Sequence, residues 1–320
     1  MTRPRPRTPK PRPVQHADAS HALEPTVAAV VRERTGCAWS RARALCTDGR
    51  VAVDGERCLD PTRRVAAGSM VVVDEQARRL RSGPLAEGAI VYADRDLVVV
   101  DKPAGMLSVP DQPGAKGTLA DYARTLLRAT GRGPDTPLDA VHRLDRDTSG
   151  LMVYARSAEA KRKLAAQFRA HDIDRMYRAI AHGDVVAARV ETLLVPDRGD
   201  GLRGSFGLFR RPRGEAPAEA RRAVTHVNPI AALAGATYVE CRLETGRQHQ
   251  IRIHLAELGH PLVGERVYIR DYRGPRIASA RTMLHAQTLG FAHPRSGARL
   301  AFRREPPEDF DSMIEALRVG

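Results

Sequence analysis

The stretch HRLDRDTSGLM, residues 142–152, is the part of the chain around which the rest is organised. It is a basic, polar loop with the carboxylate of Asp145 at its centre, and it closes on the turn-forming pair Ser149 and Gly150 between two apolar runs. Such a loop displays polar groups instead of burying them. On spacing alone it fits a charge-balanced surface turn as well as a functional loop, so the choice depends on the rest of the chain.

Length and charge limit the class of protein. The 320 residues suffice for at least one full core and allow two domains. Lys and Arg number 52 against 38 Asp and Glu, which gives a net charge of +14. Most of these cations are arginines spread along the chain, which suits phosphate contacts better than a lipid-binding patch on one helix. The expected partner is therefore a polyanion, with nucleic acid as the first choice.

The cysteines and the hydropathy pattern limit the choice of cellular compartment. Cys37, Cys46, Cys58 and Cys241 have spacings that match neither a zinc knuckle nor a small disulfide framework. No run of about 18 apolar residues and no apolar N-terminal signal region is present. We expect reduced thiols and a cytoplasmic protein with no membrane partner.

The N-terminal part predicts an arm followed by a small domain. Residues 1–16 carry Arg or Lys alternating with Pro between Arg3 and Pro13. Residues 1–20 are expected to be disordered, either as a basic arm that adds phosphate affinity or as a solvated tail. From Pro25 the pattern predicts a helix that stops at Gly36, and then a second short helix with Ser40 as its N-cap. Strand patterns follow near residues 50–55 and 68–73.

Residues 21–75 resemble the small RNA-binding domain of the S-four type, on the strings GRVAVDGE and VAAGSMVVV and two short helices. The resemblance implies that Arg41, Arg43 and Arg50 bind RNA. A generic helix-helix-hairpin domain with an unknown partner is the alternative. Residues 76–88 have no sustained hydrophobic periodicity and are interpreted as a linker to a second domain at 89–320.

The second domain alternates short β-branched runs with helical patterns. Gly246 precedes a helix whose expected apolar face is Ile251, Leu255 and Leu258, and Arg252 projects beside that face. Strands are predicted at 90–92, 97–100, 151–155, 175–181 and 239–243, helices at 119–129 and after the N-cap Ser157, and an irregular insertion at 197–222.

Five segments of this domain closely resemble the RluA-type pseudouridine synthase family: VVVDKPAGMLSVP (98–110), HRLDRDTSGLMVYA (142–155), YRA (177–179), ETGRQHQIRIHLAELGHPLVGERVY (244–268) and LHAQTLGFAHP (284–294). The resemblance covers residues 89–305 in the expected order. It implies an α+β fold in which the catalytic domain is built on a mixed, largely antiparallel sheet. It also implies isomerisation of uridine to pseudouridine in structured RNA, without a cofactor.

The family's motifs assign roles to particular residues. Asp145 is expected to be the anionic catalyst that acts on the ribose, and Arg252 its ion-pair partner. Tyr177 is expected to stack on the uracil, with a core tyrosine as the alternative. Arg143 and His142 match RNA-contacting or shaping positions, and Leu144 and Leu284 match pocket residues. Asp147 is interpreted as structural or solvated.

The remaining expectations concern partners. His249 and His254 form a weak metal pattern without a third ligand type, so we expect no metal. Large-subunit ribosomal RNA is the preferred substrate, transfer RNA is the alternative, and a non-catalytic RNA-binding or ribosome-assembly protein is the rival class. We expect a monomer. Gln248, where a small hydroxyl residue is common, and the Arg- and Pro-rich insertion at 205–222 depart from the family pattern.

Overall fold

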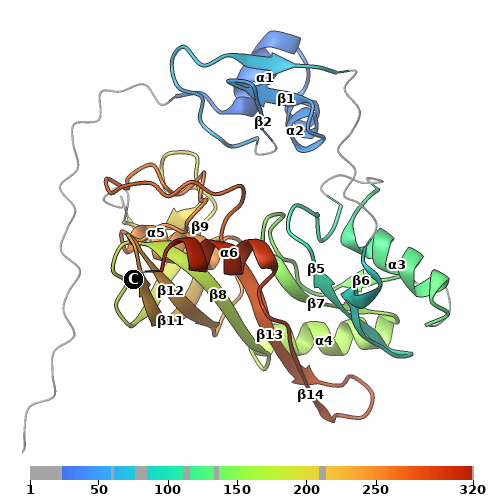
Figure 1. Cartoon of the computed structure of the whole chain (residues 1–320). Coiled ribbons are helices and arrows are strands. Elements are labelled where there is room, and N and C mark those ends of the chain that lie inside the picture. The colour runs from blue at the N-terminus through green and yellow to red at the C-terminus, as the bar shows by residue number, and fades with distance from the viewer. Residues whose placement is uncertain are drawn as a thin grey trace, which may run out of the picture. The chain divides into compact units, whose positions relative to one another are not determined.

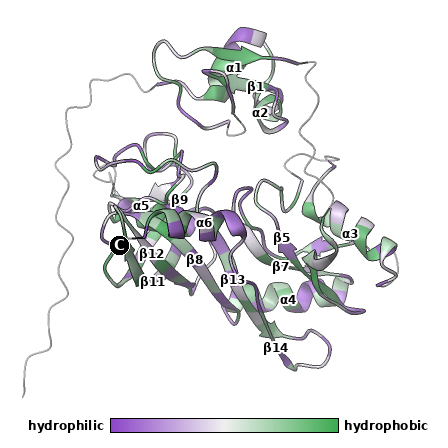
Figure 2. Cartoon of the chain, viewed as in Figure 1, coloured by the Kyte–Doolittle hydropathy of each residue, from purple (hydrophilic) through white to green (hydrophobic). Residues whose placement is uncertain are grey.

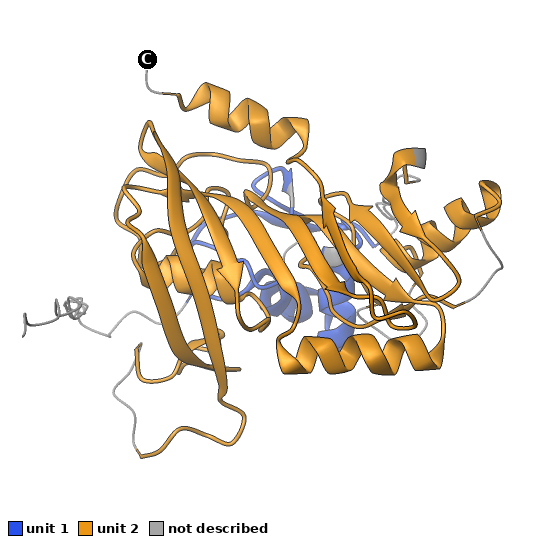
Figure 3. Cartoon of the chain, turned by 90° about the horizontal axis from the view of Figure 1, so that it is seen from below, with its two compact units in different colours: residues 1–80 blue, residues 81–320 orange. Residues whose placement is uncertain are grey.

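The computed structural model describes residues 24–58, 61–75, 85–110, 116–132, 137–208 and 214–318. The chain divides into two compact units, residues 1–80 and 81–320, and the division falls inside the segment interpreted as a linker (Figure 3). The predicted arm at 1–20 and residues 76–84 of that linker lie outside the described residues.

The first unit packs two helices on a small sheet (Figure 1). Helix α1 (Val27–Thr35) is capped by Thr26, whose hydroxyl accepts from the Ala29 amide at 3.1 Å, and it ends at Gly36 with φ +65°. Helix α2 (Trp39–Thr47) follows. The sheet has the order β2 (Glu56–Arg57), β1 (Val51–Val53), β3 (Val71–Val73).

Ser40 was expected to be the N-cap of the second helix, and this prediction is wrong. The cap is Ala38, which makes no side-chain capping bond, and Ser40 lies inside α2. The Arg32 guanidinium of α1 lies 5.2 Å from the centre of the Trp39 ring. A contact between the helices at Trp39 therefore accompanies the start of α2, and a sequence pattern does not reveal such a contact.

The second unit is built on one mixed sheet of eleven strands (Figure 1). The parallel pair is β7–β13, and the other pairings are antiparallel, which confirms the predicted fold class. The sheet order is β10-β9-β11-β12-β8-β13-β7-β5-β4, with β14 on β13 and β6 on β7. The strands are β4 (Ile90–Ala93), β5 (Leu97–Lys102), β6 (Asp139–Ala140), β7 (Ser149–Ala155), β8 (Asp174–His182), β9 (Ala188–Val195), β10 (Gly204–Ser205), β11 (Arg221–Leu233), β12 (Ala236–Leu243), β13 (Leu284–Ala292) and β14 (Arg299–Arg303).

Helices cover both faces of this sheet. Val98 and Val100 pack in one core with α3 (Leu119–Ala129), whereas Val99 packs in another with α4 (Ala158–Ala170). Because successive strand residues point to opposite faces, these two helices lie on opposite sides. Figure 2 shows that both carry hydrophobic and hydrophilic residues, as expected for helices with one face on a sheet. Helix α3 has the bounds predicted for it and begins with a capping box at Thr118, and the predicted cap Ser157 begins α4.

Three further helical segments complete the unit: η1 (Glu87–Ala89), α5 (Gln250–Glu257) and α6 (Glu308–Ala316). The expected apolar face of α5 is correct for Ile251 and Leu255, which are buried, but wrong for Leu258, which is 39% exposed. The helix ends at Glu257, so Leu258 leaves the buried face. In the described part of the chain, no helix is long and apolar enough to cross a membrane.

The predicted insertion at 197–222 is not wholly irregular. It contains the short strand β10, and its last two residues already belong to β11. The Asp197 carboxylate accepts hydrogen bonds from the amides of Gly199 and Gly201 at 2.7 and 2.9 Å, which closes the turn before β10. Residues 209–213 lie outside the described residues.

Candidate active site

The loop that contains Asp145 precedes β7, and a buried lysine binds its backbone. Lys102, at the end of β5, has no exposed surface. Its ammonium donates to the carbonyls of Arg146 and Thr148 at 2.7 Å each, and to that of Pro103 at 3.0 Å. Burial lowers the pKa of Lys102 to about 7, and the charges of Asp147 and Asp145 oppose this shift. One side chain thus fixes the backbone on the C-terminal side of Asp145.

A serine fixes the backbone on the other side of Asp145. The buried Ser108 hydroxyl donates to the Leu144 carbonyl at 2.8 Å and lies 3.1 Å from the Leu144 amide. The Gly105 amide donates to the Arg146 carbonyl at 2.9 Å. Lys102 and Ser108 both lie in the motif at residues 98–110, but the sequence alone did not predict their roles. The available signal was a lysine at the end of an apolar strand, where a buried ammonium requires hydrogen-bond acceptors.

We predict that Lys102→Met lowers both stability and turnover. Methionine fills the space but leaves three buried carbonyls without a donor, which should cost about 3 kcal/mol or more in the free energy of unfolding. The rate at saturating RNA should fall because the backbone around Asp145 loses its attachment. Lys161→Met is the matched control, since Lys161 forms an exposed pair with Asp139. Equal unfolding midpoints in urea for the two variants would contradict this role.

Arg252 bridges two carboxylates. It projects from α5, and its Nη1 donates to Asp145 Oδ2 at 3.1 Å. Its Nε and Nη2 donate to the two oxygens of Glu265 at 2.7 and 2.8 Å. The Glu265 side chain is completely buried, and Oε1 also accepts from the amides of Arg266 and Val267. Glu265 therefore orients the guanidinium toward Asp145, a role that sequence reasoning missed.

Asp145 stays ionised although it is mostly buried. Its side chain is 19% exposed. Burial alone raises the pKa of an aspartate, but His249 and Arg252 outweigh it and hold the pKa of Asp145 below its usual range. The His249 Nε2 lies 3.7 Å from Asp145 Oδ1, and its Nδ1 lies 2.8 Å from the Tyr268 hydroxyl. Both oxygens of Asp145 thus face a nitrogen-bearing side chain.

These groups surround one cavity, with about 370 Å³ of empty space that is partly open to solvent. Five of the residues predicted for the site by motif line it together with Asp145. The lining residues are Arg143, Leu144, Asp145, Thr148, Tyr177, Leu243, Arg247, His249, Gln250, Ile251, Arg252 and Leu284.

His142 does not line this cavity. Its Nε2 accepts from the Val153 amide at 3.0 Å, and its ring stacks on Phe168 with 4.6 Å between centroids. Burial lowers the pKa of His142 to about 3, so it carries no charge that could attract RNA. These contacts fit a residue that shapes the loop, and an RNA contact of His142 stays a prediction.

Tyr177 lies on β8, is 8% exposed, and lines the same cavity as Asp145. If the ring supports a base by stacking, Tyr177→Phe should retain most activity. Tyr177→Leu should lose about 1 to 3 kcal/mol of transition-state stabilisation, because the π-face is gone. Single-turnover rates on the same RNA measure the difference. Equal rates for Phe and Leu would show that the tyrosine is only a core residue.

Of the three arginines predicted to bind RNA in the first unit, two make contacts with Glu75 of the same unit. Arg41 forms an exposed ion pair with Glu75 at 2.9 Å, and Arg50 donates to the Glu75 carbonyl. Arg43 is exposed on α2. Exposed pairs of this kind contribute little to stability and open easily for a stronger polyanion. Their RNA contacts remain a prediction.

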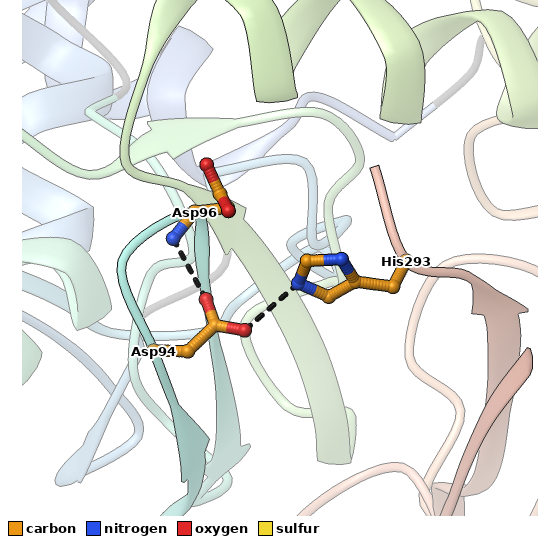
Figure 4. Close-up of side chains that lie close together, drawn as sticks. All are labelled: Asp94, Asp96 and His293. Atoms are coloured by element: carbon orange, nitrogen blue, oxygen red, sulfur yellow. Dashed lines mark hydrogen bonds and ion pairs between the residues drawn. The ribbon is translucent and has the colours of Figure 1, made fainter. Parts of the chain in front are cut away.

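Two groups of residues contain side chains of the types that bind metal ions. His254 is buried between Thr192 and Thr225, so it does not pair with His249. Asp94, Asp96 and His293 lie close together in the second unit (Figure 4).

The ligand atoms of this second cluster are already engaged. One Asp94 oxygen meets His293 Nε2 at 2.8 Å, and the other accepts from the amides of Asp96 and Leu97. Both Asp96 oxygens bind Arg295 at 2.6 and 2.7 Å. We interpret the cluster as a structural link between the turn that joins β4 to β5 and the turn that joins β13 to β14.

The cavity combines an ionised carboxylate, a fixed arginine and an aromatic ring. A carboxylate held in a shielded pocket can attack a carbon or take a proton. The ring can support a planar base, and Arg143 at the rim adds a positive charge. This arrangement suits chemistry on the sugar of one nucleotide that has left its stack.

Comparison with known proteins agrees with this reading. Residues 96–257 match the family described as RNA pseudouridylate synthase. A protein of Zymomonas mobilis named "Ribosomal large subunit pseudouridine synthase D" is 38% identical over 246 residues, which cover 72% of this chain and 73% of the relative. Relatives with the same name in Pseudomonas aeruginosa and Escherichia coli O157:H7 are each 34% identical, covering 87% and 88% of this chain and 87% and 86% of their own.

Two solved structures share the fold. "Human RNA Pseudouridylate Synthase Domain Containing 4" aligns with a TM-score of 0.56 at 23% identity, over 71% of this chain and 92% of that one. "Human RNA Pseudouridylate Synthase Domain Containing 1" aligns with a TM-score of 0.52 at 22% identity, over 71% and 87%.

Proposed function

The chain belongs to the RNA pseudouridylate synthase family, and from this premise we propose that it converts specific uridines of large-subunit ribosomal RNA to pseudouridine. The names of its relatives favour this substrate over transfer RNA. One observation on this chain carries the catalytic part of the proposal. The Asp145 carboxylate lies 3.1 Å from Arg252, in a cavity that Tyr177 also lines.

The reaction is an isomerisation, so nothing is consumed. The bond between ribose C1′ and uracil N1 breaks, a bond from C1′ to C5 forms, and the proton lost from C5 is balanced by one gained at N1. Asp145 acts on the ribose as nucleophile or base, and Arg252 keeps it ionised. Tyr177 supports the uracil while it turns, and Leu144 and Leu284 shape its pocket. Arg143 occupies the space that the uridine leaves in the RNA.

The first unit and the charge of the chain supply affinity. We assign residues 21–75 to RNA binding and residues 89–320 to catalysis, with Arg41, Arg43 and Arg50 as phosphate contacts. Because a +14 protein binds many RNAs through phosphates, binding alone does not identify the substrate. The protein is proposed to act as a monomer in the cytoplasm, where ribosomal RNA is available.

The decisive test is a map of the product. In cells that lack the protein, total RNA should lose pseudouridine at one or a few uridines of large-subunit ribosomal RNA. These uridines should lie in loops or distorted helices, where a base leaves its stack easily. Re-expression of the wild type should restore the marks. Loss confined to transfer RNA would replace the substrate but keep the enzyme, whereas no loss in any RNA would favour the non-catalytic rival.

A further inference from the structure

Arg175 is a buried arginine that the proposed chemistry does not use. It lies on β8 two residues before Tyr177, so its side chain leaves the sheet on the same face. It is only 9% exposed. Its Nη2 donates to the Glu244 carbonyl at 3.3 Å, but its Nε is buried without a hydrogen-bond partner. In the described part of the chain, no carboxylate lies within ion-pair distance of it.

A buried cation without a counter-charge is costly. Removing charge from water carries a desolvation penalty that only a good ion pair repays, and natural proteins rarely leave a buried donor unsatisfied. Burial, and the nearby charge of Arg247, lower the pKa of Arg175. The Arg175 guanidinium also lies 5.7 Å from the centre of the Phe168 ring, but neither this contact nor the hydrogen bond to Glu244 supplies a counter-charge. The fold therefore holds a buried guanidinium whose charge an anion would compensate.

Two further arginines extend this positive region to the cavity. Arg247 lines the cavity, donates to the Arg222 carbonyl at 3.0 Å, and has a pKa lowered by burial and by Arg221. Arg221 donates to the Ala218 and Ala220 carbonyls. Among the described residues, neither arginine has an acidic partner within ion-pair distance.

The carboxylate of Glu244, whose backbone carbonyl accepts from Arg175, is paired with other side chains. Glu244 meets His226 at 2.8 Å, Arg189 at 3.4 Å and Arg222 at 3.7 Å. Charge thus remains uncompensated at Arg175, Arg221 and Arg247, which we call the arginine cluster.

We propose that the arginine cluster binds a backbone phosphate of the RNA, next to the nucleotide whose base enters the cavity. This inference rests on the proposed function in one respect, namely that the substrate is RNA. A phosphate has the oxygens that forked guanidinium donors prefer, and it supplies the charge that the cluster lacks. Arg247 belongs to both the cavity and the cluster, which places the phosphate beside the target nucleotide.

Gly246 offers a test that leaves net charge unchanged. A Cβ on this glycine would lie 2.1 Å from Nη1 of Arg175. The contact is with the far end of a flexible side chain, so Gly246→Ala should fold while its methyl group pushes the guanidinium away. The variant changes the position of the cation and keeps its charge.

The experiment measures the dissociation constant for transcribed large-subunit ribosomal RNA over a series of KCl concentrations, with full-length wild type, Arg175→Met, Arg247→Met and Gly246→Ala. Arg175→Met should bind at least about tenfold more weakly. The slope of log affinity against log salt should fall by about 0.7 to 0.9, the value for one phosphate. Arg175→Met/Arg247→Met should lower the slope no further, because both residues hold the same phosphate. Gly246→Ala should weaken binding as well.

Arg178→Met is the matched control. Arg178 lies on the same strand but is paired with Glu240 at 3.0 Å, so its loss removes the same charge from another place. Thermal unfolding adds an independent readout: Arg175→Met should unfold close to wild type, because the loss of one long hydrogen bond and of the contact with Phe168 is offset by the removal of a buried charge without a counter-charge.

A fall in unfolding temperature for Arg175→Met with unchanged RNA affinity would show a merely structural arginine and overturn the proposal. So would a loss of affinity no larger than that of Arg178→Met. Because the measurement requires no turnover, a wild-type protein that binds RNA but forms no pseudouridine would contradict the proposed function alone.

Discussion

Asp145→Asn is expected to abolish pseudouridine formation while RNA binding stays nearly intact. The amide keeps the shape of the side chain but loses the charge that acts on the ribose, so the rate should fall by at least about 1000-fold. The fold should persist, because Arg252 keeps its two hydrogen bonds to Glu265. Tritium release from RNA labelled at uracil C5 measures the reaction, and RNA affinity is measured in parallel.

Asp147→Asn is the control for this prediction. Asp147 lies two residues away, on the same loop and outside the cavity lining, so its amide variant should keep activity within a few-fold of wild type. If Asp145→Asn turned over normally, or if the two variants lost equal activity, Asp145 would not be the catalyst.

The pH profile should report the same carboxylate. Its pKa lies below the usual range, so Asp145 loses its charge only as pH falls through that lowered value. The rate should therefore be insensitive to acid down to about pH 5.

Arg252→Met should lower the rate by about 100-fold and destabilise the protein. The variant leaves Glu265 fully buried without its cation, which costs about 3 to 5 kcal/mol in the free energy of unfolding. It also removes one of the groups that oppose the burial of Asp145, so the pKa of Asp145 should rise. The acid side of the rate profile should move to higher pH, because the carboxylate now becomes protonated sooner. Rates at saturating RNA across pH, together with urea unfolding, measure both effects.

A double variant separates catalysis from stability. Arg252→Met/Glu265→Leu removes both buried charges, so its stability should recover relative to Arg252→Met. Its activity should remain low, because nothing then faces Asp145 Oδ2. Recovery of activity together with stability would mean that Arg252 serves only the fold.

The local elements were readable from the sequence because their signals are local. Thr118 and Ser157 start helices through their own hydroxyls, and the β-branched run at 97–100 forms a strand in the sheet. Ser40 failed as a cap because α2 begins earlier, where Trp39 contacts Arg32 of another helix. Leu258 failed because the helix ends one residue before it. A pattern of residue types contains neither kind of information.

The functional site likewise has residues that the sequence predicted and contacts that only the structure revealed. The sequence by itself predicted that Asp145, Tyr177 and Arg252 belong to one set, because each lies in one of five segments that resemble the family in the expected order. Only the tertiary structure decided what supports them: Lys102 and Ser108 hold the loop through backbone carbonyls and an amide, and Glu265 fixes Arg252. It also placed His142 against Phe168 instead of in the cavity lining, and it left the Nε of Arg175 buried without a hydrogen-bond partner. Hydrogen bonds to backbone and the balance of buried charge depend on which distant segments meet, and residue order alone does not specify that.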